Sequence, residues 1–302
     1  MNVICAIKTS FRILGKNFIL AQPLVLYLLI FTVLSAGLHT LKSNQPAFII
    51  FSITLLLLGC AFLAGWFYMV KKTISFELDT DLNDEEKAFQ SFGLIKHFFP
   101  GVGEYFLPMV GTLLFYLICS LIVATLTLKF GLKHIGAIDI DLEQLNKASA
   151  TVQTMYAYFD SIPPENVVAI KRWFLLIMTA ATGFQFVTIW LFPALFYKSK
   201  NPLIAILESI KFLFRKLGAT IAIFTFLLIF NFFVSIINSL SAINVFFSLL
   251  GFIIFFYFTT YCIVLIFLYY GKNGESSAKD YIYRRDDCDG EKLAGSESGT
   301  ED

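Results

Sequence analysis

Six long apolar stretches constrain the fold of this chain more than any other feature of its sequence. A helix needs about 20 apolar residues to cross the ~30 Å hydrocarbon layer of a bilayer, and each stretch reaches that length. None of them contains Asp, Glu, Lys, Arg or His, and they cover residues 17–37, 47–70, 105–128, 173–197, 217–243 and 245–270. Hydrophobic residues make up 57% of the chain, more than soluble domains usually carry. We therefore expect an all-α polytopic membrane protein with six transmembrane helices.

The basic residues between these stretches predict the orientation of the chain. If the N-terminus is cytoplasmic, the segments on that side hold 17 Lys and Arg residues and the outer loops hold 6. Cytoplasmic loops carry the excess of Lys and Arg in membrane proteins. We expect both termini in the cytoplasm and the long loop 129–172 outside. The net charge of +1 gives no general argument for a nucleic-acid partner.

An amphipathic segment, "NPLIAILESIKFLFRK" (201–216), separates the fourth and fifth apolar stretches. Asn201 and Pro202 are typical of a helix start. One stripe at helical spacing is apolar and comprises Leu203, Leu207, Ile210, Phe214 and Leu217, while Glu208, Lys211 and Arg215 occupy another face. An amphipathic helix with a basic edge is typical of the interface at an anionic membrane surface.

Two further segments resemble it, one at residues 3–16 and one at 84–99. The first carries Val3, Ile7, Phe11 and Leu14 on the opposite side from its bases, and the second begins with three acids. Each such segment precedes an odd-numbered span. The even-numbered spans end in "WFYMVKK", "ALFYKSK" and "FLYYGKN", and aromatic residues followed by Lys anchor a helix at the interface. We therefore interpret the chain as three hairpins, each preceded by an amphipathic interfacial helix. The alternative is that any membrane protein shows such endings.

Outside residues 1–271, which we assign to the membrane domain, the sequence predicts a disordered polar cytoplasmic tail at 272–302. In the outer loop, helical spacing predicts a surface helix of about 20 residues at 141–160, stopped by Pro163 and Pro164. This helix is either a lid over an opening between spans or, as we favour, the closure of a long connection.

Polar side chains near the middle of spans three to six form a candidate midplane site. They are Tyr116, Gln185, Asn231, Thr259 and Thr260. They could line a substrate path, but hydrogen bonding between helices is the more economical interpretation. Candidate contacts to lipid headgroups are the basic residues of two amphipathic segments, namely Lys8, Arg12, Lys16, Lys211, Arg215 and Lys216. No pattern indicates catalytic, cofactor-binding or metal-binding residues, and we expect no cofactor and no enzymatic activity.

The segment "NPLIAILESIKFLFRKLGA", with two spans ending in "YCIVLIFLYYGK", resembles a group of uncharacterised bacterial six-span integral membrane families. These families are similar to the membrane domain of glycerophosphodiester phosphodiesterases. The resemblance covers residues 190–272 and implies a non-catalytic protein of the bacterial inner membrane, because the acids and histidines of the phosphodiesterase domain are missing. We expect a structural, accessory or lipid-associated role with anionic lipids as partners. The alternative is a small transporter or permease subunit that uses the midplane polar residues.

Overall fold

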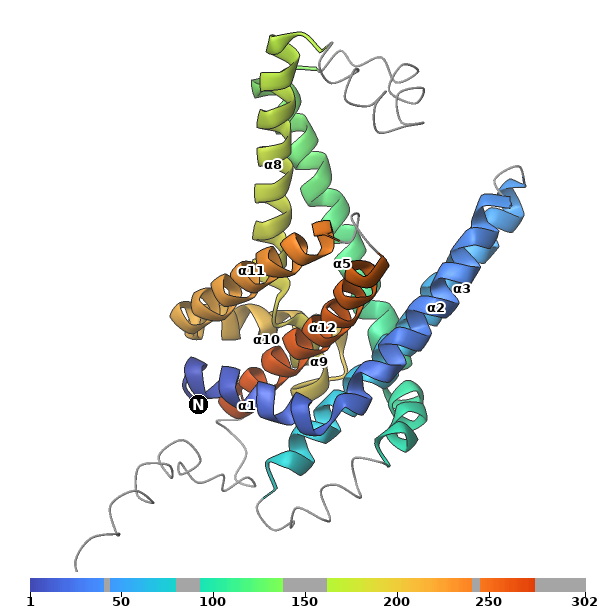
Figure 1. Ribbon diagram of the computed structural model, residues 1–302, viewed down its shortest axis with the longest axis vertical. Helices are drawn as coiled ribbons and strands as arrows, with labels where there is room; N and C mark the ends of the chain where they lie inside the picture. The colour runs from blue at the N-terminus through green and yellow to red at the C-terminus, as the bar shows by residue number, and fades with distance from the viewer. Residues whose placement is uncertain (41–43, 80–92, 138–161, 241–244, 275–302) are drawn as a thin grey trace, which may run out of the picture. The chain divides into compact units, whose positions relative to one another are not determined.

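The computed structural model describes residues 1–40, 44–79, 93–137, 162–240 and 245–274, and this part of the chain is all-helical (Figure 1). The chain forms two compact units, one of residues 1–111 and 190–302 and the other of residues 112–189. The predicted surface helix at 141–160 lies outside the described residues. So do the tail from residue 275 and most of the predicted amphipathic segment 84–99.

Within the described residues, six helices are long and apolar enough to cross a membrane, which agrees with the number of spans expected from the sequence. They are Phe18–Gly37, Gln45–Glu77, Leu94–His134, Pro164–Tyr197, Leu217–Ile237 and Phe247–Gly274. Several extend beyond the apolar stretches that predicted them, because a helix that has already formed continues at little cost into flanking polar residues.

The first unit is built around helix α12 (Val245–Gly274), which packs against helices from both ends of the chain. These are α1 (Val3–Lys16), α3 (Gln45–Glu77), α9 (Leu191–Tyr197) and α11 (Leu217–Leu240). Its core is rich in buried aromatic rings, including Trp190, Tyr261, Phe267 and Tyr270. Aromatic side chains bury a large area each and therefore dominate the packing here.

Short helices and turns connect the longer elements of this unit. The 3-10 helix η1 (Phe18–Ala21) joins α1 to α2 (Gln22–Thr40), which lies alongside α3. The 3-10 helix η2 (Leu94–His97) leads into α5 (Phe98–His134), and α10 (Pro202–Arg215) packs against α9.

The fourth span is interrupted, although the apolar stretch 173–197 predicted a kinked but continuous span. Helix α8 (Pro164–Thr188) ends before a turn at Ile189 and Trp190, and α9 begins at Leu191. Pro193 in the first turn of α9 has no N–H to donate back across this turn, so its position agrees with the break. In contrast, α5 continues through Pro108 as a single helix.

The second unit consists of helix α8 and the part of α5 that follows Gly111. Near the end of α5, Trp173 of α8 joins the two helices. The indole of Trp173 donates a hydrogen bond to the carbonyl of Gly136 at 3.0 Å. Gly136 adopts a φ of 93°, a left-handed conformation that glycine permits at the end of a helix. The ring lies so close to Gly131 that a Cβ there would come within 2.2 Å of it. Helix α5 ends at His134 and helix α8 begins at Pro164, so both reach into the region 129–172 that the sequence assigned to the outer loop.

Candidate functional site

Helices α1 and α10 are matched amphipathic helices, although their first residues lie 199 positions apart in the sequence. Each has 14 residues, and each ends in a break before a membrane-spanning helix. The backbone at the two breaks is nearly the same, with φ and ψ of −122° and 52° at Asn17 and of −121° and 33° at Lys216. Both segments therefore turn by the same local conformation, and neither continues straight into its span.

The two helices also bury corresponding residues. The buried faces are Ala6, Ser10, Ile13 and Leu14 in α1, and Ala205, Ser209, Phe212 and Leu213 in α10. The small Ala and Ser side chains allow close approach of the neighbouring helices, which are chiefly α12 for α1 and α9 for α10. The stripes expected from the sequence do not form these faces, apart from Leu14.

The apolar stripe of α10 is instead exposed, with Leu207 and Phe214 exposed by 67% and 70%. Helix α1 exposes Ile4 and Phe11 in the same way, and Phe11 also stacks on Tyr261 with ring centroids 4.2 Å apart. Exposed apolar residues beside charged ones are typical of a helix that lies in a membrane interface. The apolar stripe of α10 is therefore free to contact acyl chains.

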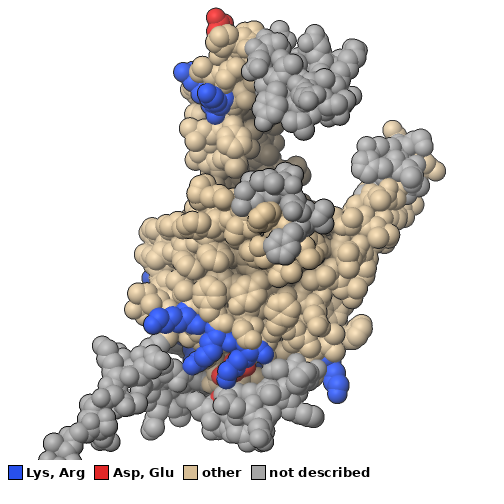
Figure 2. All heavy atoms as spheres, in the orientation of Figure 1, with Lys and Arg blue, Asp and Glu red and all other residues tan. Residues whose placement is uncertain are grey.

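The six bases expected to contact headgroups lie beside these apolar rows. Lys8, Arg12 and Lys16 are exposed on α1, Lys211 and Arg215 are exposed on α10, and Lys216 is half-buried at the break. We call these six residues the basic edge. Lys211 also lies 3.6 Å from Glu208, an exposed pair of the kind that contributes little to stability. Figure 2 shows Lys and Arg gathered along the margin of the apolar surface of this unit.

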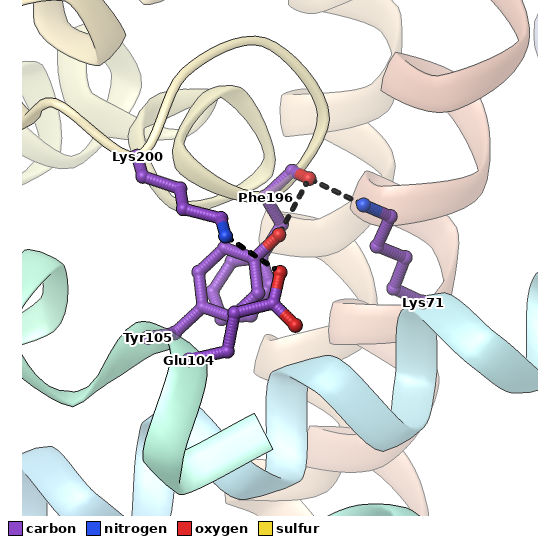
Figure 3. Close-up of polar contacts among 5 residues, drawn as sticks. All are labelled: Lys71, Glu104, Tyr105, Phe196 and Lys200. Atoms are coloured by element: carbon purple, nitrogen blue, oxygen red, sulfur yellow. Dashed lines mark hydrogen bonds and ion pairs between the residues drawn. The ribbon is translucent and has the colours of Figure 1, made fainter. Parts of the chain in front are cut away.

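A second polar group surrounds the backbone carbonyl of Phe196, near the end of α9 (Figure 3). The Lys71 ammonium donates a hydrogen bond to this oxygen at 2.6 Å, and the Tyr105 hydroxyl donates to it at 3.5 Å. The last carbonyls of a helix lack partners in the helix and attract cations. Lys71 therefore links α3 to the end of α9.

Glu104 and Lys200 close the side of this group, with 2.9 Å between the carboxylate and the ammonium. The Lys200 ammonium also lies 5.5 Å from the centre of the Tyr105 ring. Both side chains are partly exposed, so the pair adds little energy. The group as a whole fastens α3, α5 and α9 to one another.

The five predicted midplane residues are divided between the two units. Tyr116 and Gln185 belong to the second unit, while Asn231, Thr259 and Thr260 belong to the first. The Tyr116 ring packs on Phe184, and the two threonine hydroxyls donate to carbonyls four residues earlier in α12. The side chains of Gln185 and Asn231 are exposed. A common midplane site therefore remains a prediction.

Among the described residues there is no group of three or more His, Cys, Asp or Glu that could hold a metal ion. No protein-family model matches this chain, and neither a search of curated proteins nor a search of solved structures finds a similar protein.

Sequence reasoning missed two participants at the ends of the helices. The Phe196 carbonyl is a backbone group, so its role cannot be predicted from the type of residue. Asn273, which accepts hydrogen bonds from Met1 and Arg215, lies in the "FLYYGKN" ending that was interpreted only as an anchor. The lysine of that motif was interpreted as the anchor, whereas the side-chain amide and the backbone carbonyl of the neighbouring Asn273 accept these hydrogen bonds.

Proposed function

We propose that this chain is a non-enzymatic integral membrane protein that binds anionic phospholipids along its basic edge. The observation that carries the proposal is the match between α1 and α10. Both bury an Ala and a Ser followed by two large apolar residues, expose an apolar row, and present bases beside that row. This arrangement suits a helix whose apolar row contacts acyl chains while its bases contact headgroups.

The matched helices also support an internal duplication in which amphipathic helices precede hairpins. Their equal lengths, corresponding buried positions and similar breaks exceed what apolar composition alone would produce. The proposal places both helices at the cytoplasmic leaflet, because cytoplasmic segments are rich in Lys and Arg. It also places the protein in a bacterial inner membrane, on the strength of the sequence resemblance.

The alternative function, a small transporter, requires polar groups that face one another within the membrane. The threonine hydroxyls satisfy their hydrogen bonds within α12 itself, so they need no polar partner from another span. The lipid-associated role therefore has the stronger support.

Native mass spectrometry with phosphatidylglycerol tests the proposed function. Each Lys or Arg near an anionic surface contributes about 1 kcal/mol of attraction. The triple variants K8Q/R12Q/K16Q and K211Q/R215Q/K216Q should therefore each retain several-fold less lipid than the wild type. The spans should stay intact, because no apolar residue changes.

The control is K129Q/K171Q/R172Q, which removes three exposed bases from α5 and α8. It has the same change in charge but leaves the basic edge untouched, so it should retain lipid like the wild type. Equal retention by all four proteins would contradict the proposal and leave packing as the role of the two helices.

A further inference from the structure

The exposed faces of α1 and α10 correspond position by position. Val3 begins α1 and Pro202 begins α10, and this shift of 199 positions aligns the two buried faces. The same shift aligns the six exposed positions of α1 with six exposed positions of α10. Some of these pairs are alike, such as Ile4 and Leu203, which are 64% and 65% exposed. The two helices therefore meet their surroundings through the same positions.

Two of these exposed pairs differ in chemistry. Leu207 of α10 stands at the position of Lys8 in α1, and Phe214 stands at the position of Gly15. Both apolar side chains are largely exposed, so they extend into the surroundings and not into the core. The matched face of α10 therefore has two more large apolar side chains than that of α1, and one base fewer.

This difference changes how each helix meets a membrane. The binding of an interfacial helix depends on its buried apolar area and on the attraction of its bases to anionic lipids. Bases dominate the exposed face of α1, which suits contact with headgroups. The face of α10 carries an apolar row that takes up space among acyl chains, and this row comprises Leu203, Leu207, Ile210 and Phe214. Because the buried faces correspond, packing against the core does not offset the difference.

Helix α10 lies at one end of the last span. The Phe212 ring packs on the Tyr270 ring with 4.5 Å between centroids, and Nη2 of Arg215 donates to the carbonyl of Asn273 at 3.2 Å. Both partners belong to the last turns of α12, which ends at Gly274. The apolar row therefore meets one leaflet of a membrane that α12 crosses. An apolar wedge in one leaflet costs least where convex curvature spreads the lipids of that leaflet.

We propose that α10 inserts its apolar row between the acyl chains of one leaflet and directs the protein to membrane in which that leaflet is convex. Helix α1, with Lys8 and Gly15 at the corresponding positions, contributes attraction to headgroups instead. The inference rests on the proposed association of the two helices with lipids and adds a dependence on membrane shape.

Membrane tubes pulled from giant vesicles test this inference with the full-length protein. The vesicles contain phosphatidylcholine and phosphatidylglycerol with unsaturated chains, and a fluorescent protein is fused after residue 302. This label reports the side of α10, since α10 ends beside the end of α12. Protein with the label outside should be enriched several-fold in the tube relative to the flat membrane. A membrane-impermeant quencher removes that population, and the remaining protein, with α10 in the concave leaflet, should be depleted from the tube.

Exchange of the differing residues between the helices isolates the contribution of the row. L207K/F214G gives α10 the residues of α1 and should abolish most of the enrichment. K8L/G15F gives α1 the residues of α10 and should increase it, and a Cβ at Gly15 would meet no atom within 4 Å. L207F/F214L keeps the row apolar and should behave like the wild type, which separates lost apolar contact from lost folding. Wild-type enrichment in L207K/F214G, or no gain in K8L/G15F, would overturn the inference and leave a protein partner as the occupant of the row.

K8Q/R12Q is the matched control, because it removes two exposed bases and no apolar side chain. It should retain less phosphatidylglycerol in native mass spectrometry and keep its enrichment in tubes. An equal loss of enrichment in K8Q/R12Q and L207K/F214G would assign the sorting to charge and overturn the role of the row.

Two further outcomes separate this inference from the proposed function. If the wild type shows no enrichment while its retention of phosphatidylglycerol depends on the basic edge, the inference fails and the proposed function stands. If retention is the same in all variants of the basic edge, the proposed function fails, whereas the tube measurement still decides the inference by itself.

Discussion

The indole of Trp190 donates a hydrogen bond to the hydroxyl of Thr220 at 3.0 Å, and both side chains are fully buried. Thr220 donates in turn to the carbonyl of Lys216 at 3.0 Å, at the break between α10 and α11. The first half of the chain has a counterpart, because the indole of Trp66 donates to the carbonyl of Leu20 at 2.9 Å, beside the break that follows α1. A buried tryptophan therefore fixes each of the two breaks.

Replacement of Thr220 by Val should destabilise the first unit by about 1–3 kcal/mol. The two side chains have nearly the same shape, but Val leaves the buried indole N–H of Trp190 without an acceptor. Thermal unfolding in detergent measures the effect. The control is T259V, since the Thr259 hydroxyl donates only to a carbonyl of its own helix. Equal losses from both variants would contradict a special role for the pair.

Two glycines of α5 should respond to alanine in opposite directions. A Cβ at Gly101 would come within 2.5 Å of the Cβ of Tyr68, which cannot easily move because it adjoins the backbone of α3. G101A should therefore destabilise the protein. Gly103 has open space around it, and G103A should stabilise the exposed helix by up to about 1 kcal/mol. Melting temperatures of the two variants provide the comparison, and a stabilising G101A would contradict the packing described for α3 and α5.

Loss of the Lys71 side-chain ammonium should loosen the end of α9. K71M removes the hydrogen bond of 2.6 Å to the Phe196 carbonyl, and hydrogen bonds of charged groups contribute about 1.5–3 kcal/mol. K72M is the matched control, because the neighbouring lysine lies over the Tyr68 ring, with 5.7 Å between its ammonium and the ring centre. Hydrogen exchange at residues 191–197 should rise in K71M and change little in K72M. The reverse order would exclude Lys71 as the link.

The predicted topology can be tested with single cysteines introduced in place of Ser149 and Ser277. In intact cells, a membrane-impermeant thiol reagent should label position 149 and leave position 277 unlabelled, because the excess of Lys and Arg places the latter side in the cytoplasm. A background that lacks the native cysteines serves as the control. Labelling of position 277 without position 149 would reverse the orientation.

The sequence determined the elements that follow from hydrophobic length and local chemistry. Six uncharged apolar stretches gave six helices of membrane-spanning length, because a backbone in lipid must satisfy its own hydrogen bonds. Asn201 and Pro202 marked the start of α10 correctly, and the Asn201 side chain accepts from the N–H of Leu203 at 3.0 Å. The apolar stretch 173–197 did not indicate the break before Leu191.

The tertiary structure alone decided which faces pack. The sequence pattern located the apolar stripe that contains Leu207 and Phe214, but it did not say which face of α10 packs against neighbouring helices. In a membrane, lipid tails are as apolar as leucine, so hydrophobicity does not distinguish a helix contact from a lipid contact. Helix α10 packs through Ala205 and Ser209 together with Phe212 and Leu213, while it exposes Leu207 and Phe214. The meeting of α1, α10 and α12 at Asn273 depends on this packing, which no local pattern encodes.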